Sequence, residues 1–419
     1  MADVDDQWHK LVDGKKVRTD KYGRGKRWRA RWRDETGAQR QTSFDTKTEA
    51  DRHIATVKAD MLRKTYIDPA AGKVTFKSYA ERWRAAQIHE DSSVKQVESR
   101  LRLHVYPFFG DRQIASIKPS EAQRWIRVLE NGGDGRAPLM PATVEVIYQF
   151  TNAIFAAAIK DKVVGTSPFD GLKRSKIVPK RVAPPSLEQV NAIYAAMPEK
   201  YRALVTIGSG IGLRQGEAVA LELDCIDFLG RKLNVRQQLI CPTGAEAFLR
   251  LPKGRKTRSV ALAGLVVDEL SRHVKEFGTT PVEVWDRTNL AKPVRRRAEF
   301  LFVDKLGMPI RSNTFSARLW APARRAAKLP TEMTFHDLRH FFASLLIRYG
   351  ESVKTVQHAL GHATAGMTLE VYGHLWPDSE DRTRLAIEAG FKGDVGAMWA
   401  DLAGGAESSR SGAMRSLSS

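Results

Sequence analysis

The hydrophobic pattern changes its period along this chain, and that change constrains the fold more than any other feature. The first patterned run, residues 27–33, alternates strictly as Arg-Trp-Arg-Ala-Arg-Trp-Arg. In a strand, this period places Trp28, Ala30 and Trp32 on one face and the arginines on the other. Such an arginine-lined ribbon can enter a groove of DNA, although a solvated strand face shows the same pattern. The residues predicted to contact DNA here are Arg27, Arg29, Arg31 and Arg33.

The segments that follow this run complete a small N-terminal module. Residues 34–37 have the composition of a turn, and residues 38–44 that of a returning strand. Thr46 with Glu49 three residues later makes a capping box that opens a helix. We therefore predict a three-stranded sheet plus one helix over residues 1–66, an arm-type DNA-binding domain.

A helical period then replaces the alternation. Phe76 and Tyr79 begin an apolar stripe at helical spacing, and Pro119 and Pro141 stand at the start of later stripes. These stripes are typical of a core and carry no chemistry. We predict an all-helical domain over residues 74–169.

Residues 170–185 are basic and contain prolines, which is the composition of an extended linker. Its positive charge would suit a strap along a DNA backbone, although many linkers are basic without binding anything. The residues predicted to contact DNA in it are Lys173, Arg174, Lys180 and Arg181.

The remaining pattern predicts one more domain, so that the fold class is multidomain, mainly α with small β elements. Residues 186–390 are mostly helical in pattern, with a strand-rich insert near 225–262. Residues 391–419 are rich in Gly, Ala and Ser, and we expect this tail to be partly mobile.

The charge balance favours a polyanionic partner. The chain has 68 Lys+Arg against 48 Asp+Glu, a formal net charge of +20. Each phosphate that a Lys or Arg neutralises releases condensed counterions. The two cysteines cannot make a disulfide framework, and neither an apolar targeting core nor a run of 18 apolar residues is present. We expect a cytoplasmic protein that is neither secreted nor membrane-spanning, with DNA as the leading partner.

Four short polar segments in the third domain combine residue types that can act on a phosphodiester. Two guanidiniums can each present paired N–H donors to non-bridging phosphate oxygens, a geometry that Lys cannot match. His336 and Arg339 lie three apart, so on a helix they share a face and can reach one phosphate together. The four segments are residues 212–217, 251–260, 334–340 and 360–372.

In kind, order and spacing, these segments resemble the tyrosine recombinases, the phage-integrase family, and the layout is most similar to temperate-phage integrases of actinobacteria. The resemblance implies an enzyme that cleaves and rejoins DNA through a 3′-phosphotyrosyl link, without metal, ATP or another cofactor. By motif match it implies six catalytic residues: Arg214, Lys253, His336, Arg339, His362 and Tyr372. Tyr372 is the expected nucleophile, His336 is expected to assist proton transfer at the tyrosine, and His362 is expected to hydrogen-bond the phosphate.

Two further residues have supporting roles by the same resemblance. Glu217, three residues after Arg214, is expected to orient local groups. Lys253 is the expected general acid for the departing 5′-oxygen, and Lys256 stays a rival because the turn is slightly shorter than the commonest family pattern. His340 and His358 are interpreted as polar groups satisfied within their helices, since a metal site would need further ligands.

The resemblance also implies partners and leaves alternatives open. It implies double-stranded DNA with core-type and arm-type attachment sites, a homotetramer on DNA, and an excisionase and a host DNA-bending protein as candidate partners. A chromosome-dimer or transposon-type recombinase of the same chemistry is an alternative. A non-catalytic DNA-binding regulator on this scaffold is another, which the complete set of six side chains disfavours.

Overall fold

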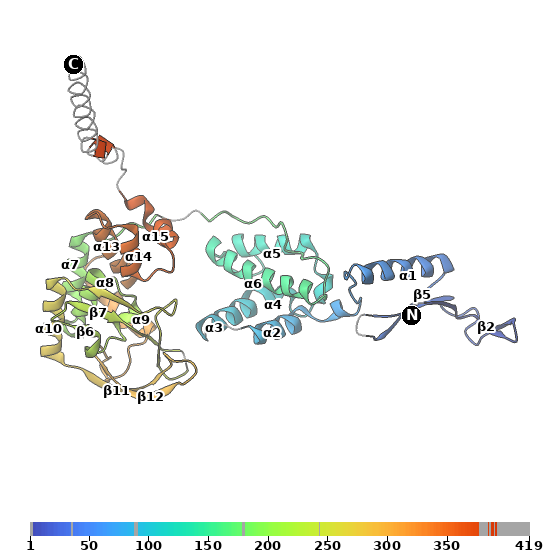
Figure 1. Cartoon of the computed structure of the whole chain (residues 1–419), viewed down its shortest axis with the longest axis horizontal. Helices are drawn as coiled ribbons and strands as arrows, with labels where there is room; N and C mark the ends of the chain where they lie inside the picture. The colour runs from blue at the N-terminus through green and yellow to red at the C-terminus, as the bar shows by residue number, and fades with distance from the viewer. Residues whose placement is uncertain are drawn as a thin grey trace, which may run out of the picture. The chain divides into compact units, whose positions relative to one another are not determined.

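The computed structural model describes residues 3–34, 37–87, 91–177, 181–242 and 244–376, together with 384, 387, 388, 390 and 391. The chain forms two compact units, Met1–Pro179 and Lys180–Ser419 (Figure 1). The predicted fold class, mainly α with small β elements, is confirmed. Except for Phe391, the predicted tail over 391–419 lies outside the described residues.

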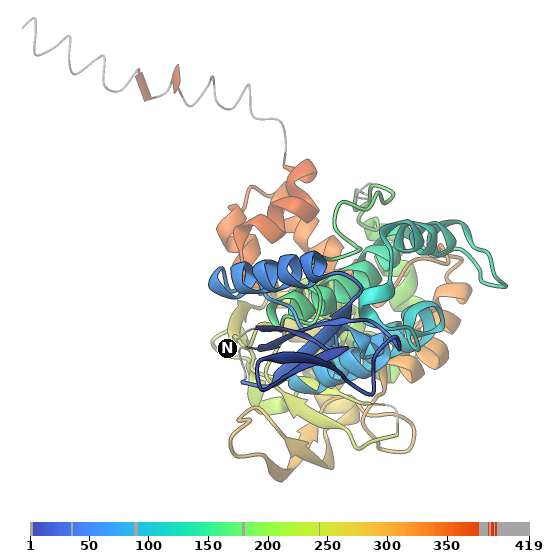
Figure 2. The same cartoon turned by 90° about the vertical axis from the view of Figure 1, so that its right-hand side faces the viewer.

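The first unit begins with a three-stranded antiparallel sheet in the order β1-β4-β5. The alternation over 27–33 forms its central strand, in which Ala30 and Trp32 are buried. Helix α1 covers one face of this sheet (Figure 2). The predicted capping box at Thr46 and Glu49 opens α1. A basic hairpin of two strands, which the sequence pattern did not predict, is inserted between β1 and β4. The elements are β1 (Asp3–Asp6), β2 (His9–Val12), β3 (Lys15–Arg18), β4 (Trp28–Arg33), β5 (Gln39–Phe44) and α1 (Lys47–Leu62).

The same unit continues as a helical bundle with its own core. Phe109, Trp125 and Phe169 meet edge to face, at centroid separations of 5.6 to 5.8 Å. Such packing adds to the stability that burial of the rings provides. The helices are α2 (Phe76–Ala86), α3 (Asp91–Arg100), α4 (Tyr106–Phe109), α5 (Pro119–Asn131) and α6 (Pro141–Lys160), with a π-helical segment (Leu101–Val105) joining α3 to α4.

Helix α6 is, within the described residues, long and apolar enough to cross a membrane. Its side chains Ile147, Ile154 and Phe155 are fully buried in the bundle, and the rings of Phe155 and Phe76 stack at 5.7 Å. These buried side chains belong to the core of the bundle, and a core helix passes the same test of length and composition.

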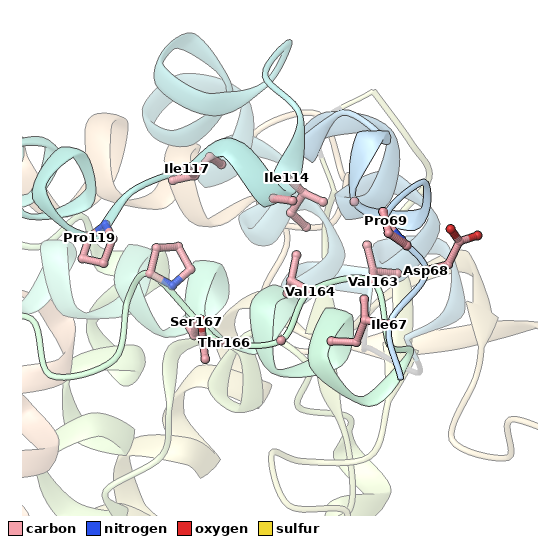
Figure 3. Close-up of a pocket in the computed structure, with 14 residues that line it drawn as sticks. Ile67, Asp68, Pro69, Ile114, Ile117, Pro119, Val163, Val164, Thr166 and Ser167 are labelled. Atoms are coloured by element: carbon pink, nitrogen blue, oxygen red, sulfur yellow. The ribbon is translucent and has the colours of Figure 1, made fainter. Parts of the chain in front are cut away.

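A small pocket of the first unit lies where the chain leaves α1 and passes the bundle (Figure 3). Ile67 and Pro69 line it on one side, and Ile114, Val163 and Val164 line it from the bundle. The pocket contains none of the residues predicted to act on DNA.

The second unit packs helices against two small sheets. One sheet has the order β10-β7-β6 and the other β12-β11-β9-β8; the predicted insert near 225–262 supplies β6 to β10, and the pair β11 and β12 lies beyond it. Its strands are β6 (Ile226–Asp227), β7 (Lys232–Val235), β8 (Gln238–Ile240), β9 (Phe248–Arg250), β10 (Arg258–Ala261), β11 (Thr280–Asp286) and β12 (Val294–Phe300).

Two helices of this unit approach each other closely enough to require a glycine. A Cβ at Gly208 of α8 would lie 2.8 Å from the Cδ1 atom of Leu338 on α13. The helices α13, α14 and α15 gather on the side of the unit away from β11 and β12 (Figure 1). The helices are α7 (Leu187–Ala196), α8 (Arg202–Ile211), α9 (Gln215–Ala218), α10 (Gly264–Phe277), α11 (Ser312–Thr314), α12 (Ala321–Ala326), α13 (Phe335–Arg348), α14 (Val353–Leu360) and α15 (Ala365–Tyr372).

Candidate active site

A tight turn between α8 and α9 presents Arg214. Gly212 ends α8 with a left-handed φ of 71°, and a Cβ there would lie 2.4 Å from the Cδ1 atom of Phe342. Both the backbone conformation and the space therefore require glycine. The Arg214 side chain donates from Nη1 to Oε1 of Glu217 at 3.0 Å and from Nη2 to the carbonyl of Gly361 at 3.4 Å.

Glu217 is a buried carboxylate that two guanidiniums share. Besides Arg214, Arg258 of β10 donates from Nη1 to Oε1 at 3.1 Å and from Nη2 to Oε2 at 2.6 Å. Burial alone would raise the pKa of Glu217, but the hydrogen bonds and charge of Arg258, with the charge of Arg214, outweigh it and lower the pKa below its usual value. Glu217 thus stays ionised and fixes both arginines.

Arg339 is the most buried guanidinium of the cluster, with 1% of the residue exposed. From α13 it donates to the carbonyl of Gly212 at 2.7 Å and to the carbonyl of Leu360 at 2.5 Å, which ties together the ends of α8 and α14. Burial and the nearby charge of Arg214 lower its pKa to about 9, so it remains charged at neutral pH. Around Glu217, three guanidiniums therefore face one carboxylate, and the surplus positive charge suits an anion.

His336 and His362 lie beside this cluster as neutral imidazoles. Loss of water around the His336 ring, with the charges of His340 and Arg339, lowers its pKa to about 4, although part of the residue stays exposed. Burial and the charges of Arg339 and Arg214 likewise lower the pKa of His362 to about 4. The Nδ1 atom of His362 lies 2.9 Å from Oγ1 of Thr368. Each ring can therefore offer one N–H to an anion without adding charge.

Tyr372 ends α15 and turns its ring inward, with 1% of the residue exposed. Its ring lies parallel to that of His362, with an interplanar angle of 8° and centroids 6.4 Å apart. Its hydroxyl lies 2.8 Å from Nδ1 of His340. Burial raises the pKa of Tyr372 to about 12, even though the charges of Arg339 and Arg214 act in the opposite direction. The phenol is therefore protonated at neutral pH and lies within the field of both guanidiniums.

The two candidate lysines are exposed. Lys253 and Lys256 lie in the exposed turn between β9 and β10, where Gly254 and Arg255 adopt positive φ angles of 88° and 57°. Within the described part of the chain, neither lysine forms a hydrogen bond or ion pair with the arginine cluster. The structure thus brings together five of the six predicted catalytic residues and leaves Lys253 outside.

Two residues of the cluster were missed by reasoning from the sequence. Arg258 lies in the segment 251–260, but the motif predicts no role for it, and the sequence predicts His340 only as a polar group satisfied within its helix. The one available signal for His340 was its position four residues after His336, on the same face of α13. No local signal pointed to Arg258, since its carboxylate partner lies 41 residues earlier in the chain.

The predicted DNA-contacting arginines of the N-terminal sheet are already paired. Arg27 donates to Asp6 at 2.8 Å, Arg29 to Asp5 at 2.8 Å, and Arg31 to Asp3 at 2.8 Å, so three acids of β1 cover the row. The hydrogen bonds of Arg27 lower the pKa of Asp6 to about 2. The fourth arginine, Arg33, donates to the carbonyl of Gly37.

The predicted linker contacts are divided between the two units. Arg174 pairs with Glu145 at 2.8 Å and lies 3.6 Å from the ring centroid of Tyr148. The backbone of Lys173 exchanges hydrogen bonds with the side chain of Gln123. Arg181 is exposed, and Lys180 lies outside the described residues.

Paired guanidiniums beside a buried tyrosine hydroxyl form a site that can bind a phosphate and present a nucleophile to it. The sequence matches the phage integrase family over residues 186–378 and the phage integrase N-terminal SAM-like domain over 75–129. The chain belongs to the phage integrase family and is a site-specific DNA recombinase of the tyrosine type.

The chain is also similar to individual relatives in sequence and to solved structures in fold. The prophage phiRv2 integrase of Mycobacterium tuberculosis is 26% identical over 342 residues, which cover 79% of this chain and 84% of the relative. The Tn1549 transposon integrase bound to circular intermediate DNA has the same fold, with a TM-score of 0.63 at 23% identity over 75% of this chain and 99% of that one. A lambda integrase tetramer on a Holliday junction gives a TM-score of 0.53 at 17% identity, over 80% of this chain and 93% of that one.

Proposed function

We propose that this chain is an integrase that joins a phage or related mobile genome to a host chromosome, and also excises it, through a covalent bond to Tyr372. The observation that carries the proposal is the surplus of positive charge around Glu217, together with the tyrosine hydroxyl that faces it. A scissile phosphate would supply the missing negative charge.

The guanidiniums have donors left for that phosphate. Arg339 uses two of its five N–H groups on the carbonyls of Gly212 and Leu360, and three remain. Arg214 is held by Glu217 through Nη1 and keeps further donors free for a non-bridging oxygen. Fixed donors of this kind stabilise the charge that develops as a phosphodiester is attacked. Arg258 would act indirectly, because it holds Glu217 in place.

The remaining residues complete the reaction. His336 and His362, both neutral, would donate N–H groups to the phosphate oxygens. Tyr372 would form the 3′-phosphotyrosyl ester while the 5′-oxygen leaves as a hydroxyl, with its proton from Lys253 or, as the rival, Lys256. Because the ester keeps the energy of the broken bond, rejoining requires no ATP.

The order of the domains along the chain suggests which DNA site each domain would bind. The bundle and the catalytic domain would hold a core-type site, and the N-terminal sheet would hold an arm-type site. A homotetramer on two DNA duplexes is expected, because strand exchange takes four cleavages. An excisionase and a host DNA-bending protein are candidate partners, and the bacterial host cytoplasm is the expected location.

The test is covalent trapping on a nicked attachment-site duplex, in which the short cleaved strand diffuses away. The site itself would be taken from direct repeats that flank the element, for example beside a tRNA gene. Wild-type protein should give a denaturation-resistant protein–DNA species. Tyr372→Phe should bind the same duplex in a mobility-shift assay and give no such species. A covalent complex that persists in Tyr372→Phe would remove the proposal.

A further inference from the structure

His340 is placed to act on the reacting hydroxyl. Its Nδ1 atom lies 2.8 Å from the Tyr372 hydroxyl, and no other hydrogen bond of that hydroxyl is present in the described part of the chain. Since the phenol holds its proton and burial keeps the pKa of His340 below its ordinary value, the hydroxyl donates and the imidazole accepts. The proton of His340 then resides on Nε2.

The other ionisable groups nearby are engaged elsewhere. His362 uses Nδ1 on Thr368, and Asp337 accepts hydrogen bonds from the backbone and hydroxyl of Thr334. The His336 ring meets the His340 ring edge-on, with centroids 4.9 Å apart, so it contacts the base and not the phenol. The charges that face His340 are Asp337, which favours its protonation, and Arg339, which opposes it.

His340 also has a route to solvent. It lines an open pocket of about 440 Å³ together with residues of the extended segment at 181–185 and Glu332, Met333 and Asp337. A proton taken from the tyrosine can therefore pass to water during the lifetime of the covalent intermediate, and it can return before rejoining.

We propose that His340 is the proton acceptor for Tyr372 in strand cleavage and the proton donor in rejoining. In cleavage, the Tyr372 O–H bond breaks and its proton moves to Nδ1 of His340, while the phenolic oxygen bonds to phosphorus. The bond from phosphorus to the 5′-oxygen breaks, and that oxygen takes a proton from the general acid. Rejoining reverses each transfer.

A base is needed because ionisation alone is too rare. A phenol whose pKa is about 12 is ionised at pH 7 in only about one molecule in 10⁵. A neutral imidazole is too weak to strip that proton beforehand, so the transfer must accompany attack on the phosphate between the arginines.

The proposal rests on the proposed function, and the experiment separates the two. Wild-type trapping on the nicked duplex tests the function, whereas single-turnover cleavage by the full-length variants His340→Ala and His340→Asn tests the role of His340. The asparagine keeps an acceptor near the position of Nδ1 but has no basicity. The matched control is His358→Asn, at an exposed histidine of α14.

We expect both His340 variants to bind the duplex normally and to cleave it on the order of 100-fold more slowly, as loss of a general base does. Added imidazole should restore at least a tenth of the wild-type rate to His340→Ala, in proportion to its neutral form as pH is varied. His358→Asn should cleave like the wild type.

Faster cleavage by His340→Ala would show that the hydrogen bond is only a restraint, and would overturn the proposal. Near-normal cleavage by His340→Asn, or a loss in His340→Ala that imidazole does not rescue, would also overturn it.

Discussion

Arg258 holds both carboxylate oxygens of Glu217, at 3.1 and 2.6 Å, and donates from Nε to the carbonyl of Ala359 at 3.0 Å. One side chain of β10 thereby joins the start of α9, which Arg214 precedes, to the end of α14, which lies two residues before His362. The position of two proposed phosphate ligands, Arg214 and His362, thus depends on a residue to which the motif assigns no role.

Arg258→Gln should destabilise the catalytic unit. Removing one partner of a buried ion pair typically lowers the free energy of unfolding by about 3–5 kcal/mol. We expect the lower end here, about 3 kcal/mol, because Arg214 remains as a partner of Glu217. The measurement is urea unfolding of the full chain, followed by tryptophan fluorescence and circular dichroism. The control is Arg297→Gln, which breaks a pair whose side chains are 64% and 46% exposed and should cost less than about 1 kcal/mol. If both variants lost the same small amount of free energy of unfolding, the structural role of Arg258 would be contradicted.

Stability should also fall on mild acidification. His336 and His362 have folded-state pKa values of about 4, below the ordinary value of 6.5. Between these values the unfolded chain binds more protons than the folded one. The free energy of unfolding therefore increases with pH across this window, and it decreases as the pH falls from 6.5 toward 4. Each histidine contributes a slope of at most about 1.4 kcal/mol per pH unit, and less for His336 because it is partly exposed.

Unfolding by urea at pH 4.5, 5.5, 6.5 and 7.5 checks this dependence. The double variant His336→Gln/His362→Gln should flatten the slope between pH 4.5 and 6.5. A slope that is the same in the double variant and the wild type would show that other groups cause the acid loss.

A substrate with a different leaving group can show whether Lys253 or Lys256 is the general acid. Lys253→Ala should cleave an ordinary duplex at least about 100-fold more slowly, which is the lower range for loss of a general acid. A duplex with sulfur in place of the bridging 5′-oxygen should restore its rate, since a thiolate leaves without a proton. Lys256→Ala should show neither the loss nor the rescue. The reverse result would assign the general acid to Lys256.

Features of the fold that depend on neighbouring residues in the sequence could be predicted. The alternation over 27–33 predicted β4, and the capping box at Thr46 predicted the start of α1, because both signals lie within a few residues. The motifs located Arg214, Arg339 and Tyr372, and the structure brings these residues to one place.

Features that depend on distant pairing were not predictable. Asp5 and Arg29 are 24 residues apart, and they meet only because β1 pairs with β4 in one register, while residues 7–26 form a turn and a hairpin between them. His340 and Tyr372 are 32 residues apart on helices whose packing a single sequence does not specify. The same limit applies to Arg258 and Glu217.

The acidic row on β1 gives the N-terminal sheet a testable property. Asp5 and Asp6 neutralise Arg29 and Arg27, so these guanidiniums would release few counterions on binding random DNA, and an exchange of partners would be needed. In Asp5→Asn/Asp6→Asn, both arginines lose their carboxylates. If this face contacts DNA, affinity for a random-sequence duplex should rise at low salt, and the slope of log K against log salt should steepen by up to about 1.8.

The matched control is Asp51→Asn/Asp60→Asn, which changes the net charge of the same module equally but on α1, the helix that covers the opposite face of the sheet. Fluorescence anisotropy with a random-sequence duplex at several salt concentrations gives both slopes. A steeper slope only in Asp5→Asn/Asp6→Asn places the DNA on the arginine face, because long-range attraction by the added charge would act in both variants. Equal slopes in the two variants would mean that the DNA does not contact Arg27 and Arg29, and the assignment of this face to an arm-type site would have to be withdrawn.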